Sequence, residues 1–188
     1  MNIKIEVSAR HVHLSKKDLY KLFGDNFELS KERFLSQKGE FVAKEKLNIM
    51  GDRKKIENVS ILGPEREKTQ VEISMSDSIG LGVDTPIKCS GDHSNTPGIF
   101  LEGPNGKVLL SSGVIIAKRH IHLSSKTAED LNLEDGMEVK VSVKGERALV
   151  FEKVLLRVRN DFIDSMHIDV DEGNAAGIPR GGEGEIIL

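Results

Sequence analysis

A short motif occurs twice in this sequence, and the repeat limits the possible folds more than any other feature of the chain. Residues 8–15 read Ser-Ala-Arg-His-Val-His-Leu-Ser, and residues 117–124 read Ala-Lys-Arg-His-Ile-His-Leu-Ser. Both copies follow an apolar, strand-like run, which spans residues 3–7 before the first copy and 114–116 before the second. The repeat therefore predicts two related halves of the chain.

Each copy also runs into a sequence that is typical of a helix start. Ser15 begins a capping-box-like Ser-Lys-Lys-Asp sequence, and Gly24 provides a C-terminal stop. In the second copy, Ser124 or Ser125 would cap a short helix that reaches Leu131. We expect a short helix after each motif.

Most of the remaining chain has the pattern of short strands. β-Branched or alternating runs are separated by Gly-Pro, Asn-Gly and Lys-Gly turns, and Asn105-Gly106 is a hairpin signal. Residues 25–46 are charged and are interpreted as an excursion from the main fold. Many short strands with tight turns predict a mainly β protein with two β-barrel domains and short capping helices. The strand-like runs are residues 59–62, 70–75, 137–143, 148–158 and 185–188.

Composition excludes several classes of protein. The net charge of −3 lacks the basic footprint of a nucleic-acid-binding protein. A single cysteine excludes an internal disulfide framework and fits a reducing compartment. The sequence shows no signal-peptide core, and no apolar run approaches the roughly 20 residues of a membrane helix. We therefore expect a cytoplasmic protein without nucleic-acid or membrane partners.

The repeated histidines predict metal binding. Strand side chains alternate with period two, so His11 and His13 project from one face, as do His120 and His122. Two imidazoles on one face can share a transition-metal ion, above all zinc. One such pair is as often a surface or core pair without a metal, but two pairs in a matched repeat favour two sites.

A fainter likeness points to further ligands. Residues 71–74, Val-Glu-Ile-Ser, resemble residues 166–169, Met-His-Ile-Asp, and this match aligns Glu72 with His167. Taken alone, a glutamate on a strand is more often a solvated outward residue. The match by itself carries little weight.

Three other residues carry reactive groups. Arg66 follows a Gly-Pro turn ahead of Glu72, and its planar guanidinium suits phosphate or carboxylate, although a loop arginine is commonly just solvated. Cys89 has no adjacent base in the sequence, so we expect that it is not a nucleophile. His93 is interpreted as an ordinary loop residue.

These motifs, in this order, resemble the PduL-type phosphotransacylases (phosphate propanoyltransferases) over essentially the whole chain. The resemblance implies a fold of two β-barrels in which the N-terminal strand packs with the C-terminal half. It thereby implies a first domain of residues 10–117 and a second domain of residues 1–9 with 118–188. The matching segments are the two His-x-His motifs and residues 62–66, 69–74, 90–92, 166–169 and 171–176.

The resemblance also implies the chemistry. Family members interconvert acyl-CoA plus phosphate with acyl phosphate plus coenzyme A, use two zinc ions per chain and are commonly homodimers. Arg66 would handle phosphate, and Ser90 would donate a hydrogen bond to the developing oxyanion. His11, His13 and Glu72 would bind one zinc, and His120, His122 and His167 the other. The residues expected to contact coenzyme A are Ser8, Ala9, Arg10 and Asn174.

Two alternatives to the transferase remain at this point. A binuclear zinc hydrolase of esters or amides would use the same histidine pairs, and a non-catalytic, metal-dependent barrel would only bind a nucleotide-like ligand. The acyl-chain preference, acetyl or propanoyl, cannot be read from the sequence. Because the chain begins on its first strand without an amphipathic extension, we expect a cytoplasmic enzyme rather than one inside a bacterial microcompartment.

Overall fold

The computed structural model describes residues 1–187, and the chain divides into two compact units. The barrel unit comprises Met1–Ala9 and the chain from Lys118 onward, and the open-sheet unit comprises Arg10–Ala117. Each unit has its own buried apolar cluster, centred on residues such as Ile121 and Leu156 in the barrel unit and Ile61 and Val71 in the open-sheet unit. Isoleucine, valine and leucine dominate both clusters, because the chain has no tryptophan and few other aromatic residues.

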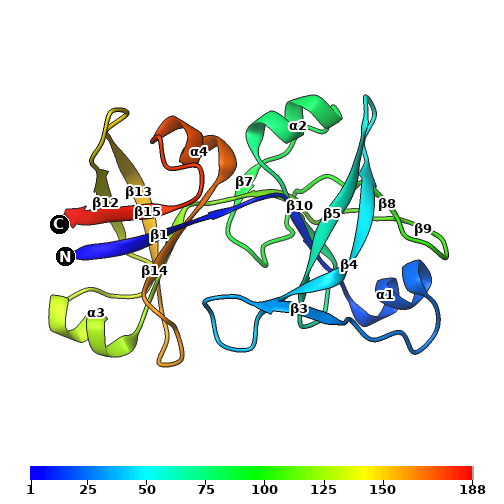
Figure 1. The fold of residues 1–188 in the computed structure, drawn as a ribbon, viewed down its shortest axis with the longest axis horizontal. Helices are drawn as coiled ribbons and strands as arrows, with labels where there is room; N and C mark the ends of the chain where they lie inside the picture. Colours follow the sequence, from blue (N-terminus) through cyan, green and yellow to red (C-terminus); the bar gives the residue numbers. More distant parts are fainter. Residues whose placement is uncertain (188) are drawn as a thin grey trace. The chain divides into compact units, whose positions relative to one another are not determined.

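The barrel unit is a closed six-stranded barrel in the order β1-β14-β11-β13-β12-β15. Strand β1 closes it by pairing in parallel with β14 and antiparallel with β15, so the two ends of the chain lie side by side (Figure 1). Its elements are β1 (Asn2–Ser8), β11 (His120–Leu123), α3 (Ser125–Leu131), β12 (Glu138–Val143), β13 (Leu149–Val158), β14 (Ser165–Asp169), α4 (Val170–Ala175) and β15 (Gly182–Ile187).

The open-sheet unit is built on a sheet in the order β7-β10-β6-β2-β5-β4-β8-β9, with β3 paired to β4. The predicted mainly β fold is confirmed, but only one of the two sheets closes completely, since no pairing joins β7 to β9. Its elements are β2 (His11–His13), α1 (Lys16–Phe23), β3 (Lys31–Phe34), β4 (Phe41–Met50), β5 (Lys55–Gly63), β6 (Gln70–Glu72), α2 (Met75–Leu81), β7 (Ile87–Lys88), β8 (Phe100–Glu102), β9 (Lys107–Leu109) and β10 (Val114–Ala117).

The internal repeat extends to strand pairing. In the open-sheet unit, β2 is parallel to β5 and antiparallel to β6, and β10 is parallel to β6. In the barrel unit, β11 is parallel to β13 and antiparallel to β14, and β1 is parallel to β14. Two four-stranded sets therefore share one topology, and each holds a His-x-His strand at an inner position.

The helix predictions after each motif are confirmed. The Ser15 hydroxyl accepts from the Asp18 amide at the start of α1, and Gly24 ends that helix. The Ser124 hydroxyl accepts from the Thr127 amide at the start of α3. Each cap satisfies an amide that would otherwise lack a partner, which fixes where these short helices begin.

Two details differ from the sequence prediction. The strand expected over residues 70–75 ends at Glu72, because Ser74 caps helix α2 by accepting from the Asp77 amide. Part of the supposed excursion, residues 25–46, belongs to the core, since Phe41, Val42 and Ala43 are buried on β4. No helix within residues 1–187 has the length and apolar character needed to cross a membrane.

Candidate metal centre

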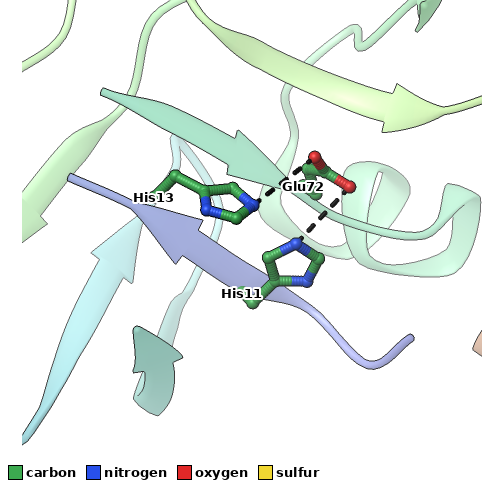
Figure 2. Close-up of side chains that lie close together, drawn as sticks. All are labelled: His11, His13 and Glu72. Carbon is green, nitrogen blue, oxygen red and sulfur yellow. Dashed lines mark ion pairs between the residues drawn. The ribbon is translucent and has the colours of Figure 1, made fainter. Parts of the chain in front are cut away.

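Two strands of the open-sheet unit bring together the first set of predicted ligands. Strands β2 and β6 pair antiparallel, with His11 opposite Glu72 and His13 opposite Gln70. Residues that are directly opposite, or two apart, project from the same face of a sheet. The Nε2 atom of His11 lies 3.4 Å from Oε2 of Glu72, and Nε2 of His13 lies 3.9 Å from its Oε1 (Figure 2). We call these three residues the first cluster.

Burial and the neighbouring charges together set the protonation states of His13 and Glu72 in the first cluster. The side chains of His11, His13 and Glu72 are only 8%, 6% and 11% exposed. Burial, with the nearby His11 and Arg66 charges, lowers the pKa of His13 to about 3. Burial alone would raise the pKa of Glu72, but the histidines, a Ser90 hydrogen bond and the Arg66 charge outweigh it and lower that pKa to about 2. At neutral pH the cluster therefore offers a neutral imidazole from His13 and a carboxylate.

A hydrogen-bonded network surrounds the Glu72 carboxylate. The Ser90 hydroxyl donates to Oε1 of Glu72 at 2.8 Å, and the Gln70 amide donates to the same oxygen at 2.6 Å. Ser90 in turn accepts from Arg66 at 3.1 Å and from Gln70 at 2.9 Å. The structure thus places Arg66 and Ser90, which the sequence analysis selected separately, in one network with the predicted ligand Glu72.

The donor set of the first cluster fits zinc. Zinc binds imidazole nitrogen and carboxylate oxygen at about 2.0–2.2 Å, so ligands of a tetrahedral site lie about 3.3–3.5 Å apart. One ligand atom from each residue of the cluster lies within 4.8 Å of the others. Small side-chain rotations would close that gap, and neutral histidine with ionised glutamate is the protonation state that metal binding requires.

The second cluster, His120, His122 and His167, gathers in the barrel unit. Strand β11 pairs antiparallel with β14, which places His120 opposite His167 and His122 opposite Ser165. The three ring centroids are 4.7 to 5.2 Å apart. Three imidazoles on one tetrahedral zinc ion would have centroids about 5 Å apart. The rings therefore have the spacing of a tris-histidine site.

The nitrogen atoms of the second cluster are less convergent. His120 Nδ1 lies 2.9 Å from the carbonyl oxygen of Lys118, a contact that orients the ring and leaves Nε2 for a ligand. His167 Nε2 lies 3.0 Å from the Ser165 hydroxyl, and His167 Nδ1 lies 4.0 Å from the Glu6 carboxylate. Among residues 1–187, only the first cluster brings three ligand atoms within 4.8 Å.

The second histidine of each pair has the same environment in both halves. Nδ1 of His13 and Nδ1 of His122 are buried and, in the part of the chain that is described, have no hydrogen-bond partner. Burial, with the charges of the other two rings, lowers the pKa of His122 to about 2. A buried polar atom without a partner destabilises the fold and calls for an explanation. Equivalent positions in both halves share this feature, which extends the correspondence between the two clusters to the environment of their second histidine.

The residues expected to contact coenzyme A lie at the end of β1, in the residues that follow it and on α4. Ser8 ends β1 opposite Asp169, which caps the helix that carries the exposed Asn174. Ala9 is exposed, and Arg10 is held by an ion pair of 2.7 Å with the buried Asp77. The Arg10 side chain therefore has a structural partner of its own, which leaves its backbone as the predicted contact.

Sequence reasoning missed two members of the first site. Gln70 is 1% exposed and bonds to Glu72, and His93 Nε2 lies 3.2 Å from the Gln70 side-chain oxygen. The period-two spacing of Gln70 and Glu72 was the available signal for Gln70. Nothing local marks His93, because a loop brings it to the site. Cys89 is exposed.

Comparisons with known proteins point to one family. The sequence model of the phosphate propanoyltransferase family matches residues 4–179. A relative from Thermotoga maritima named phosphate propanoyltransferase is 51% identical over 180 residues, which cover 95% of this chain and 86% of the relative. A relative of the same name from Listeria monocytogenes is 46% identical over 185 residues, covering 98% and 87% respectively.

Proposed function

This chain belongs to the phosphate propanoyltransferase family, a family of acyltransferases, and from that premise we propose that it interconverts short-chain acyl-CoA plus phosphate with acyl phosphate plus coenzyme A. The observation that carries the proposal is the first cluster. Buried His11, His13 and Glu72 converge beside Arg66, a residue whose guanidinium suits a phosphate anion.

We assign one zinc ion to His11, His13 and Glu72 and a second to His120, His122 and His167. Zinc in these clusters would act as a Lewis acid that stabilises a thiolate at the first and an oxygen ligand at the second. The first donor set carries the negative charge of Glu72, whereas three neutral imidazoles carry none. A charged oxygen suits the more positive second site, and we therefore assign the thiolate to the first site, since zinc binds sulfur as well as oxygen.

Direct transfer requires no acyl-enzyme. A phosphate oxygen forms the bond to the thioester carbon, the carbon–sulfur bond breaks, and its electron pair leaves with sulfur as the thiolate of coenzyme A. Arg66 binds and orients the phosphate during this step, because its bidentate fork holds two oxygens at once. The substrates meet as a near-attack pair, which supplies much of the rate enhancement.

The contacts of Ser90 lead us to revise the role that the resemblance implies for it. Its hydroxyl donates to Glu72 and accepts from Arg66 and Gln70, which uses its one hydrogen and both lone pairs. Ser90 can donate to an oxyanion only by exchanging its bond to Glu72. We therefore propose that Ser90 first holds Glu72 and Arg66 in place, and that donation to the oxyanion is its secondary role.

Coenzyme A binding is assigned to the backbone of Ser8, Ala9 and Arg10, together with Asn174. Asn174 lies exposed on α4, where its amide is accessible to a ligand. Alanine at Asn174 should raise KM for acyl-CoA without changing KM for phosphate.

We further propose that the enzyme is a homodimer. Light scattering that reports a monomer at micromolar concentration would contradict this proposal.

A binuclear zinc hydrolase is the competing function, and a barrel that only binds ligand is the third. The decisive experiment measures thiol release from acetyl-, propanoyl- and butyryl-CoA, with and without phosphate. The transferase releases thiol only with phosphate and forms acyl phosphate in equal amount. Equal thiol release without phosphate would identify a hydrolase, and no release with any acyl-CoA would leave only a binding function.

A further inference from the structure

The side chain of Gln70 uses all of its hydrogen-bonding capacity within the first site. Its nitrogen donates to Oε1 of Glu72 at 2.6 Å and to the Ser90 hydroxyl at 2.9 Å. Its oxygen accepts from the Gly91 amide at 2.7 Å and contacts Nε2 of His93 at 3.2 Å. A primary amide has two hydrogens and two acceptor lone pairs, so all four are engaged.

The neighbours of Gln70 determine which way its amide points. The Gly91 amide can only donate, and the ionised Glu72 carboxylate can only accept, so the Gln70 oxygen must face Gly91 and its nitrogen must face Glu72. An oxygen cannot donate to His93, so the proton of the neutral His93 ring lies on Nε2. Burial, with the nearby Lys68 charge, lowers the pKa of His93 and keeps that ring neutral.

In this arrangement the two carboxylate oxygens of Glu72 make different contacts. Oε1 accepts from both Gln70 and Ser90, whereas Oε2 faces Nε2 of His11 at 3.4 Å. We propose that Gln70 is a positioning residue. It holds Oε1 of Glu72, so that Oε2 is presented to the metal. It also links this carboxylate to the loop that carries Ser90 and His93. Its kinetic consequence rests on the proposed acyl transfer, but its effect on metal affinity does not.

The repeat supports this role independently. Ser165 occupies the same place in the barrel unit, two residues before His167 and opposite His122, as Gln70 is two residues before Glu72 and opposite His13. Gln70 and Ser165 are both buried, each with 1% of its surface exposed, and each contacts the third predicted ligand of its own cluster. Both halves therefore place a buried polar side chain at the position that orients the third ligand.

The structural reason for such a residue is the charge at Glu72. A buried carboxylate is costly unless hydrogen bonds satisfy it, and a carboxylate with two fixed donors on one oxygen keeps one orientation. Without Gln70, the carboxylate would lose one of those donors, and the loop would lose its bonds through Gly91 and His93. The effect should reach both metal affinity and the position of Ser90.

The test compares Gln70→Met, which keeps the volume but no hydrogen bond, with Gln70→Glu, which keeps the shape but has no N–H to donate when ionised. Thr85→Val is the control, because Thr85 is a buried residue of the same unit whose hydroxyl donates to the Val83 carbonyl away from the site. Zinc affinity, measured by competition with a chromophoric chelator, should fall about 10–100-fold in both Gln70 variants. Thr85→Val should bind zinc like the wild type.

A second measurement needs neither metal nor turnover. Long-range ¹H–¹⁵N NMR spectra of the metal-free protein should show His93 protonated on Nε2 in the wild type and a tautomer mixture in Gln70→Met. If Gln70→Met does not fold, the zinc affinity of Gln70→Glu decides alone, because the introduced carboxylate still accepts from His93 and should leave its tautomer unchanged. Zinc affinity within twofold of wild type together with an unchanged His93 tautomer would overturn the proposal. A wild-type protein that releases no thiol with phosphate would instead count against the proposed function alone.

Discussion

Glu72 and His167 occupy the same register position in the two halves of the chain. Glu72 lies opposite His11 across the β2–β6 pair, and His167 lies opposite His120 across the β11–β14 pair. In each half, the arginine before the first histidine pairs with an acidic residue five positions after the predicted third ligand. The pairs are Arg10 with Asp77 at 2.7 Å and Arg119 with Glu172 at 2.9 Å. The two halves thus share a scaffold for the predicted ligands but differ in the charge of one of them.

Each cluster should lose its own metal when one ligand is removed. We predict close to two zinc equivalents per chain for purified protein, and about one equivalent for either His11→Ala or His120→Ala. The reason is that two remaining ligands are too few for tight binding. Elemental analysis of desalted protein measures the ratio. Active protein that contains no first-row transition metal would refute both sites.

The sequence was sufficient for the parts of this molecule that depend on local patterns. The His-x-His strands, the Ser15 and Ser124 caps and the Asn105-Gly106 hairpin were predicted and are confirmed, because turns, caps and period-two alternation are local properties. The match of Glu72 with His167 was also visible as a short likeness, and the register shows the correspondence.

The rest depends on long-range pairing that no local pattern records. The closure of the barrel needs β1 beside β14 and β15, which follow more than a hundred residues later in the sequence. Helix α2 follows directly on a strand-like run and was not predicted, since its start depends on the Ser74 cap rather than on periodicity. His93 likewise becomes a site residue only through loop placement, whereas Gln70 lies on β6, two residues before Glu72.

The metal-free protein should lose stability as the pH falls below about 6.5. Burial, with the nearby His11 and Arg66 charges, holds the pKa of folded His13 at about 3, against 6.5 for a free side chain. The unfolded chain therefore binds a proton between these values that the native chain does not, so the free energy of unfolding falls as the pH falls from 6.5 to 3. The slope from His13 is at most about 1.4 kcal/mol per pH unit. Urea unfolding at a series of pH values measures it.

The window between pH 6.5 and 4.5 separates the effect of His13 from that of Glu72. The depressed pKa of Glu72 acts in the same direction, but only as the pH falls from 4.5 to about 2. His13→Gln should flatten the dependence of stability on pH in the upper window, whereas Thr85→Val should lower stability without changing that slope. An unchanged slope in His13→Gln would show that this ring is not held neutral in the native protein.

Cys89 should be dispensable for turnover. It is exposed, and direct transfer needs no covalent acyl intermediate on the protein. We predict that Cys89→Ser keeps most of the wild-type kcat in the thiol-release assay, with an unchanged zinc content. A loss of about a thousandfold with both metals in place would instead indicate an acyl-cysteine route.

Arg66 should control phosphate use. Its guanidinium donates to Ser90, which also bonds to Glu72, so the arginine is held beside the first cluster. Phosphate brings about two negative charges, and a guanidinium held there offsets part of them. Arg66→Ala should remove this alignment while leaving every predicted zinc ligand in place. The loss of one preorganised donor typically lowers the rate about 10²–10³-fold, and phosphate affinity should fall with it.

The matched variant for this residue is Arg66→Lys. Lysine keeps the positive charge but lacks the planar fork, so it should restore phosphate affinity more than turnover. Phosphate titrations of thiol release give kcat and KM for both variants, and their zinc content is measured in parallel. Partial rescue by lysine with normal metal content separates a phosphate-binding role from a structural one. If Arg66 were purely structural, Arg66→Ala and Arg66→Lys would lose activity to the same extent. Wild-type phosphate affinity and turnover in fully metallated Arg66→Ala would remove Arg66 from the site.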